Sequence, residues 1–95
     1  MNRKLDNGIF LIDVGYRNDI PIALVEKHYN ENVEYIIAFN YKIDNNKINW
    51  GYGYYYNKNI GKAIEDFKKV LAGHNLADTF LRKKGVINRA IRDKR

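Results

Sequence analysis

The segment Val33–Tyr56 reads VEYIIAFNYKIDNNKINWGYGYYY, and apolar or aromatic residues recur at every second position over most of it. A period of two predicts β-strands, here at 33–43 and 48–56. Between the two runs, Asn45 and Asn46 accept the positive φ that a two-residue primed turn requires. The segment therefore predicts an antiparallel hairpin. The cross-strand pairs of its register are Ile43–Ile48, Tyr41–Trp50, Phe39–Tyr52, Ile37–Tyr54 and Tyr35–Tyr56.

Two shorter apolar runs precede this hairpin and predict further strands, at Ile9–Val14 and Ile20–His28. The polar residues 29–32 predict a second turn, which places Ile22 and Leu24 beside Phe39 and Ile37. Residues 8–57 are therefore expected to form an antiparallel β-meander of three or four strands.

After Tyr56 the apolar residues follow the period of an amphipathic helix, so residues 59–72 are predicted to be helical. Asn59 is a suitable N-cap and Gly73 a suitable C′ residue. Asn75 then caps a basic helical C-terminal segment at 75–95. The chain is expected to be a single α+β domain, 1–95, with a three- or four-stranded antiparallel meander, one amphipathic helix and this basic segment.

The two faces of the meander differ in character, and one helix can cover only one of them. Face A carries Ile22, Leu24, Tyr35, Ile37, Phe39, Tyr41, Trp50, Tyr52, Tyr54 and Tyr56. Face B carries Ala23, Val25, Ile36, Ala38, Asn40, Gly51, Gly53 and Tyr55. Burial of the larger apolar area predicts that the helix covers face A. The alternative places the helix on face B, where small residues allow close approach, and leaves the aromatic rings of face A as a platform for stacking bases.

A mixed arrangement is also open, in which the Ile and Phe half of face A is buried and the Tyr54–Tyr56 end is exposed. Under it, Tyr54, Tyr55 and Tyr56 are candidates for stacking on bases. The glycines of Gly51-Tyr52-Gly53 lie within a strand pattern, so they indicate close packing or a bulge rather than a phosphate loop.

Residues 82–95 carry the whole net charge of the chain: they hold seven cations and one acid, which gives +6, whereas residues 1–81 hold ten of each sign. Positive charge concentrated on one element attracts polyanions or an acidic protein surface. The candidate contact residues are Arg82, Lys83, Lys84, Arg89, Arg92, Lys94 and Arg95.

The residue types limit the chemistry. The chain has no Cys, Ser or Gln, and its one Thr, Thr79, has only His74 nearby as a base, so a nucleophile and base pair is poorly supported. His74 and Asp78 lie four residues apart, but a metal site needs a third ligand. We expect no catalytic site, no metal and no cofactor. The short, interrupted apolar runs predict neither a signal peptide nor a membrane span, and the lack of Cys fits the cytoplasm.

Three pieces of the chain carry a resemblance: YIIAFNY at Tyr35–Tyr41, WGYGYY at Trp50–Tyr55, and the following helix with Ala63, Asp66 and Phe67. They resemble small uncharacterised accessory domains of phages and mobile elements of low-GC Gram-positive bacteria. The resemblance implies a setting in which small proteins act by binding, including anti-CRISPR inhibitors of host defence.

These observations lead to two hypotheses of function. The first is a non-enzymatic binding protein that contacts nucleic acid or a nucleoprotein complex through its basic C-terminal segment. The alternative is a phage or mobile-element protein, anti-CRISPR-like, that blocks a host defence enzyme by protein–protein contact. In the second case a homodimer formed through an uncovered sheet face is conceivable.

Overall fold

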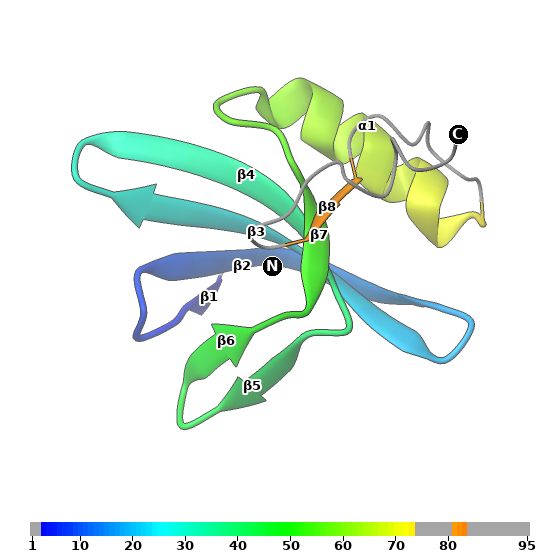
Figure 1. Cartoon of the computed structure of the whole chain (residues 1–95), viewed down its shortest axis with the longest axis horizontal. Coiled ribbons are helices and arrows are strands. Elements are labelled where there is room, and N and C mark those ends of the chain that lie inside the picture. The colour runs from blue at the N-terminus through cyan, green and yellow to red at the C-terminus, as the bar shows by residue number, and fades with distance from the viewer. Residues whose placement is uncertain (1–2, 74–80, 84–95) are drawn as a thin grey trace.

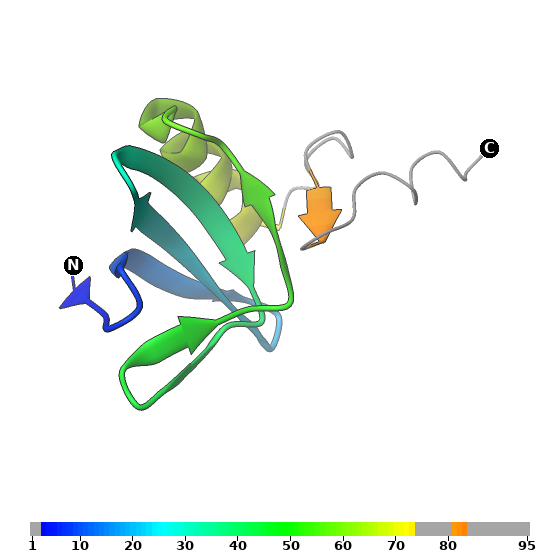
Figure 2. The same cartoon turned by 60° about the vertical axis from the view of Figure 1, so that its left-hand side comes forward.

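Residues 3–73 and 81–83 form an antiparallel sheet with one helix on one face and a small hairpin on the other (Figures 1 and 2). A computed structural model describes residues 3–73 and the backbone of 81–83. The main sheet has six strands in the order β1-β2-β3-β4-β7-β8, and β5 and β6 form a separate two-stranded sheet. The elements are β1 Arg3–Lys4, β2 Ile9–Arg17, β3 Ile20–Tyr29, β4 Asn32–Phe39, β5 Lys42–Asp44, β6 Lys47–Asn49, β7 Tyr52–Tyr55, α1 Ile60–Leu71 and β8 Leu81–Lys83. The α+β class is confirmed.

Both predicted turns form, and they fix the predicted registers. Asn45 and Asn46 have φ values of 54° and 61°, as a primed turn requires. The pairs Phe39↔Tyr52, Ile37↔Tyr54 and Ile43↔Ile48 are all present. The turn at 30–31 pairs Ile22 with Phe39 and Leu24 with Ile37, also as predicted.

The long hairpin is not continuous, however, because it bends sharply at Asn40 and Gly51. Asn40 has a left-handed φ of 58°, and its N–H donates to the Pro21 carbonyl 2.8 Å away. Beyond the bend, the β5–β6 hairpin turns under face B, so Ile48 is buried there with Tyr41 and Trp50 packed around it. The placement of Tyr41 and Trp50 on face A is therefore wrong.

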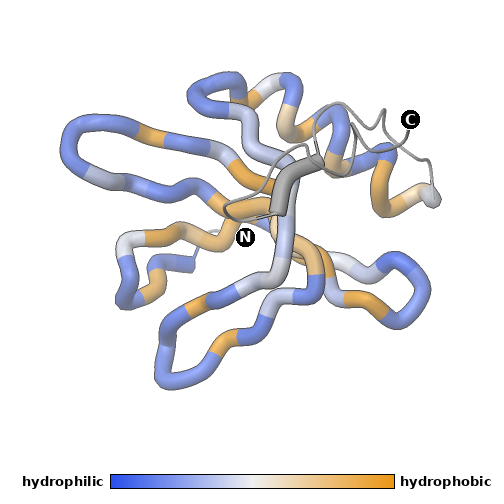
Figure 3. The backbone as a smooth tube through the Cα atoms, in the orientation of Figure 1, coloured by the Kyte–Doolittle hydropathy of each residue, from blue (hydrophilic) through white to orange (hydrophobic). Residues whose placement is uncertain are grey.

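The helix α1 covers face A, which confirms the interpretation of that face as core. Asn59 caps α1, because its side chain accepts from the Lys62 N–H at 3.0 Å, and Gly73 follows the last turn with φ 89°. The core on this face consists of Ile22, Leu24, Ile37, Phe39, Tyr54, Tyr56, Ala63, Phe67 and Val70. In Figure 3 the hydrophobic segments meet where the strands cross, whereas most hairpin tips are hydrophilic.

Face B has a core of its own, which the sequence did not indicate. It consists of Leu5, Ile9, Leu11, Ala23, Val25, Ile36, Ala38 and Ile48. The segment after β1 and the β5–β6 hairpin cover it together. The centre of the sheet is thus covered on both faces within the described residues, so these residues offer no uncovered sheet centre for a dimer interface. The homodimer itself stays a hypothesis.

The sheet also extends further than predicted, through the edge strands β1 and β8. The prediction of helix is wrong at Leu81–Lys83, because the backbone there is extended and pairs antiparallel with β7. The remainder of the predicted 75–95 segment lies outside the described residues. Over 3–73 and 81–83, no helix is long and apolar enough to cross a membrane.

Candidate functional site

The basic C-terminal segment joins the body of the protein at a defined place, the outer edge of β7. Gly53 pairs with Arg82 and Tyr52 with Lys83 in the β7–β8 ladder. Five of the seven candidate cations lie outside the described residues: Lys84, Arg89, Arg92, Lys94 and Arg95. The backbone pairing of β8 therefore fixes where the basic segment starts on the protein surface.

A small pocket lies beside this junction, on face A of the sheet. Its volume is about 150 Å³, and its lining residues are Arg17, Asn18, Ile20, Ile22, Phe39 and Tyr52. The Tyr52 ring is stacked on Phe39, with centroids 5.0 Å apart and an interplanar angle of 8°. Because the backbone of Tyr52 pairs with Lys83, the pocket lies beside strand β8, at the start of the basic segment.

Cations of the described body also lie at this corner. Arg17 Nη2 donates to the Gly73 carbonyl at 3.3 Å, just after the C-terminus of α1. Lys68 and Lys69 are exposed in the last turn of the same helix. The C-terminal end of a helix carries partial negative charge, which favours cations there. We name Arg17, Tyr52, Lys68, Lys69 and strand β8 the basic corner.

The sequence did not single out Arg17 or Tyr52 as candidate site residues. They come from separate strands, β2 and β7, and no local motif joins them. The fold brings them together because β2, β3, β4 and β7 are consecutive in the sheet. The only available signal was the terminal charge itself, which points to the class of partner and not to the neighbouring surface.

The expectation that the Tyr54–Tyr56 end stays exposed for stacking is wrong. Tyr54 and Tyr56 are 8% and 6% exposed and belong to the core under α1. Tyr55 lies on the opposite face, half-buried, and its hydroxyl accepts from Trp50 Nε1 at 3.0 Å. The buried rings of Tyr54 and Tyr56 offer no face to a base, because they pack against α1 in the core.

Among the described residues, Tyr56 has the most strongly shifted pKa, and its role is structural. The Tyr56 hydroxyl donates to Asp66 Oδ2 at 2.9 Å, and Asp66 is only 1% exposed. Lys62 Nζ lies 3.2 Å from Oδ1 as an ion pair, although Oδ1 receives no well-directed hydrogen bond. Burial, followed by the hydrogen bond to Asp66, raises the pKa of Tyr56 far above its usual range. This cluster lies beneath α1, away from solvent.

The histidines do not form a metal site within the described residues. His28 pairs with Glu26 and lies 5.1 Å from the Phe10 ring, measured between ring centroids. Burial, with a hydrogen bond to the same Glu26, raises the pKa of Tyr35. Across 3–73 and 81–83, no three His, Asp or Glu side chains gather as metal ligands would, and His74 and Asp78 lie outside these ranges.

Comparisons of the chain with protein family models, curated proteins and solved structures give no significant match.

Proposed function

We propose that this protein is a non-enzymatic binding protein whose basic C-terminal segment contacts nucleic acid or a nucleoprotein complex. The observation that carries the proposal is the charge distribution. Residues 82–95 hold a net charge of +6, whereas the preceding 81 residues are formally neutral. A single strongly positive element on a neutral body concentrates the potential that attracts phosphates.

The attachment of this segment supports the proposal. Because β8 pairs with β7, the basic residues begin at the sheet edge and next to the basic corner. There, Arg17 and Lys68 add positive charge from the described body, whereas Lys69 is paired with Glu65 at 3.3 Å. Contacts of Arg and Lys with phosphates position a protein on nucleic acid without reading its sequence. We therefore expect binding that depends on backbone charge more than on base sequence.

Charge reversal within the segment tests the proposal. The double substitution Arg89→Glu and Arg92→Glu should weaken binding of the full chain to a labelled oligonucleotide by at least about tenfold, because phosphate contacts are lost and repulsion replaces them. Fluorescence anisotropy with single-stranded RNA, single-stranded DNA and duplex DNA measures the affinity.

The matched control is Lys42→Glu with Lys58→Glu, which makes the same change of charge at two exposed positions of the body. The control should lose markedly less affinity than the Arg89/Arg92 variant. Equal losses would show that net charge alone matters, and retained binding in the Arg89/Arg92 variant would refute the assignment. Absence of binding to all three nucleic acids would favour a protein target, such as a host defence enzyme.

A further inference from the structure

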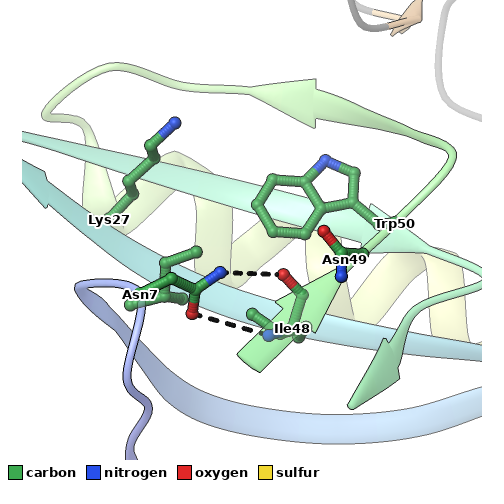
Figure 4. A pocket seen from close by; sticks show the side chains of 6 residues that line it. Asn7, Lys27, Ile48, Asn49 and Trp50 are labelled. Carbon is green, nitrogen blue, oxygen red and sulfur yellow. Dashed lines mark hydrogen bonds between the residues drawn. The ribbon is translucent and has the colours of Figure 1, made fainter. Parts of the chain in front are cut away.

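A second, larger pocket lies on the opposite side of the sheet, between the main sheet and the β5–β6 hairpin. Its volume is about 260 Å³, and its lining residues are Asn7, Ile9, Lys27, Ile48, Asn49 and Trp50. Figure 4 shows Lys27 on one side, Trp50 with Asn49 on the other, and Asn7 with Ile48 between them. We name it the hairpin pocket. Its size is just under that of pockets for drug-sized ligands, so it suits one ring system with its substituents.

Hydrogen bonds hold the walls of the hairpin pocket in place. Asn7 Nδ2 donates to the Ile48 carbonyl at 3.0 Å. The N–H of Asp6 donates to the Asn46 carbonyl at 2.7 Å, and Asn46 Nδ2 donates to Asp6 Oδ1 at 2.9 Å. Trp50 Nε1 donates to Tyr55 Oη at 3.0 Å, and this hydrogen bond fixes the orientation of the indole ring. The pocket is therefore formed before any ligand arrives, as ligand sites usually are.

The chemistry of the lining combines three kinds of group. Ile9 and Ile48 are apolar, and the half-exposed Trp50 adds an aromatic surface. Asn49 is exposed, and its amide offers one donor group and one acceptor, the pair that recognises the edge of a base. Lys27 is the one charged residue of the lining.

Lys27 is placed to accept an anionic group. Within residues 3–73, its ammonium group makes no ion pair and lies 5.7 Å from the centre of the Tyr29 ring. No carboxylate lines the hairpin pocket, and Glu34, which lies opposite Lys27 in the β3–β4 register, is not part of its lining. An anion that enters next to a planar ring therefore meets a cation without competition from an acid in the lining.

We propose that the hairpin pocket binds one nucleotide unit, with the base against Trp50, its edge at Asn49 and its phosphate at Lys27. Stacking of a base on an aromatic side chain tolerates different bases, so we expect little discrimination among them. This inference deepens the proposed function. It rests on that function where it takes the nucleotide to be part of a nucleic acid strand. The unit comes either from such a strand or from a free nucleoside monophosphate.

Trp50 makes the test direct, because it is the one tryptophan of the chain and gives a single indole N–H resonance. The full-length protein, labelled with ¹⁵N, is titrated with AMP, CMP, GMP and UMP and separately with inorganic phosphate. The indole resonance of Trp50 and the side-chain amide of Asn49 should shift together and saturate with each nucleotide, and phosphate alone should shift neither to the same extent. No saturable shift at millimolar nucleotide would overturn the proposal.

Lys27→Gln should weaken AMP binding at least about fivefold, as loss of a charged contact does, while Lys58→Gln, at an exposed position before α1, should leave it unchanged. Equal affinities in the two variants would overturn the assignment of the phosphate to Lys27. Saturation by a six-residue single strand at lower concentration than by AMP would identify the strand as the source, and the reverse order would identify the free nucleotide.

The two proposals fail separately. In one case AMP shifts the Trp50 resonance saturably, but Arg89→Glu with Arg92→Glu does not change the binding of a strand. That result would support the pocket proposal and refute the proposed function. In the other case the binding of a strand depends on those arginines, but neither mononucleotide nor strand shifts the Trp50 resonance. That result would support the proposed function and refute the pocket proposal.

Discussion

Replacing Gly53 by Ala should lower the free energy of unfolding by about 3 kcal/mol. A Cβ atom at this position would lie 2.5 Å from the Ile37 carbonyl oxygen and 3.2 Å from Ile36 Cγ2. The oxygen belongs to the backbone of β4, which pairs with β7 at this level, so it cannot move without breaking the ladder. Overpacking typically costs about 1–3 kcal/mol, and contact with a backbone atom places Gly53→Ala at the upper end of this range. A chain of this length has about 5–14 kcal/mol of stability in total.

The control for Gly53 is two residues away. At Gly51, a Cβ atom would meet no atom within 4 Å, so Gly51→Ala should change the free energy of unfolding by no more than about 0.5 kcal/mol. Urea denaturation followed by far-UV circular dichroism measures both. Similar stabilities for the two variants would contradict the close packing of β7 on β4.

Tyr56→Phe should lower the free energy of unfolding by about 2–3 kcal/mol, because it leaves the buried Asp66 carboxylate without its hydrogen-bond donor. Tyr56 is 6% exposed and Asp66 1%, so water cannot replace the hydroxyl. The ion pair with Lys62 reaches Oδ1 alone and does not compensate at Oδ2. Tyr52→Phe is the matched control: it removes a hydroxyl from a half-buried tyrosine of the same sheet and should cost less than about 0.5 kcal/mol.

The dependence of this difference on pH provides an independent check. Burial and Asp66 raise the pKa of Tyr56 in the folded state above the value of about 10 in the unfolded chain. The folded state therefore holds the tyrosine proton more tightly than the unfolded chain does. The contribution of this proton to the free energy of unfolding is fully present below about pH 10, and above it declines by up to about 1.4 kcal/mol per pH unit. The gap in stability between the wild type and Tyr56→Phe should narrow between about pH 10 and 11. A constant gap would exclude a protonated, hydrogen-bonded Tyr56.

The parts of the fold that follow from local patterns were predictable from the sequence. Asn45 and Asn46 define a turn whose geometry fixes the register of the hairpin, because the side-chain period of a strand is two. The limits of α1 follow from the Asn59 cap and from Gly73, which adopts the positive φ that it needs. The burial of Ile37 and Phe39 under α1 follows from the larger apolar area of face A.

The parts that depend on distant contacts were not predictable. Asn40 lies within an unbroken apolar alternation, so the sequence pattern gives no sign of its left-handed conformation. This conformation turns the β5–β6 hairpin onto the second core, which is a contact between distant parts of the chain. The short strands β1 and β8 lack any alternation, and each is defined by its backbone pairing with a neighbouring strand, β2 and β7 respectively. Burial of Tyr56 depends on Asp66, ten residues away in α1.

The same division applies to the candidate sites. The charge of residues 82–95 is visible in the sequence and gives the class of partner. The hairpin pocket could not be predicted from the sequence, because its lining residues Asn7, Lys27 and Trp50 come from three separate segments. It also depends on the bend at Asn40 and Gly51. The sequence placed Trp50 on the face that α1 covers, where it could not line this pocket.

The dependence of binding on salt shows most directly whether the basic C-terminal segment contacts phosphates. If about five cations pair with phosphates, the logarithm of the binding constant should fall with the logarithm of salt concentration at a slope near −4 to −5. The full chain is titrated against a labelled single strand and a duplex at several salt concentrations. We expect this slope, and a shallower one after Arg89→Glu and Arg92→Glu; a slope near zero would contradict phosphate contact and would indicate contacts that do not depend on charge, such as stacking.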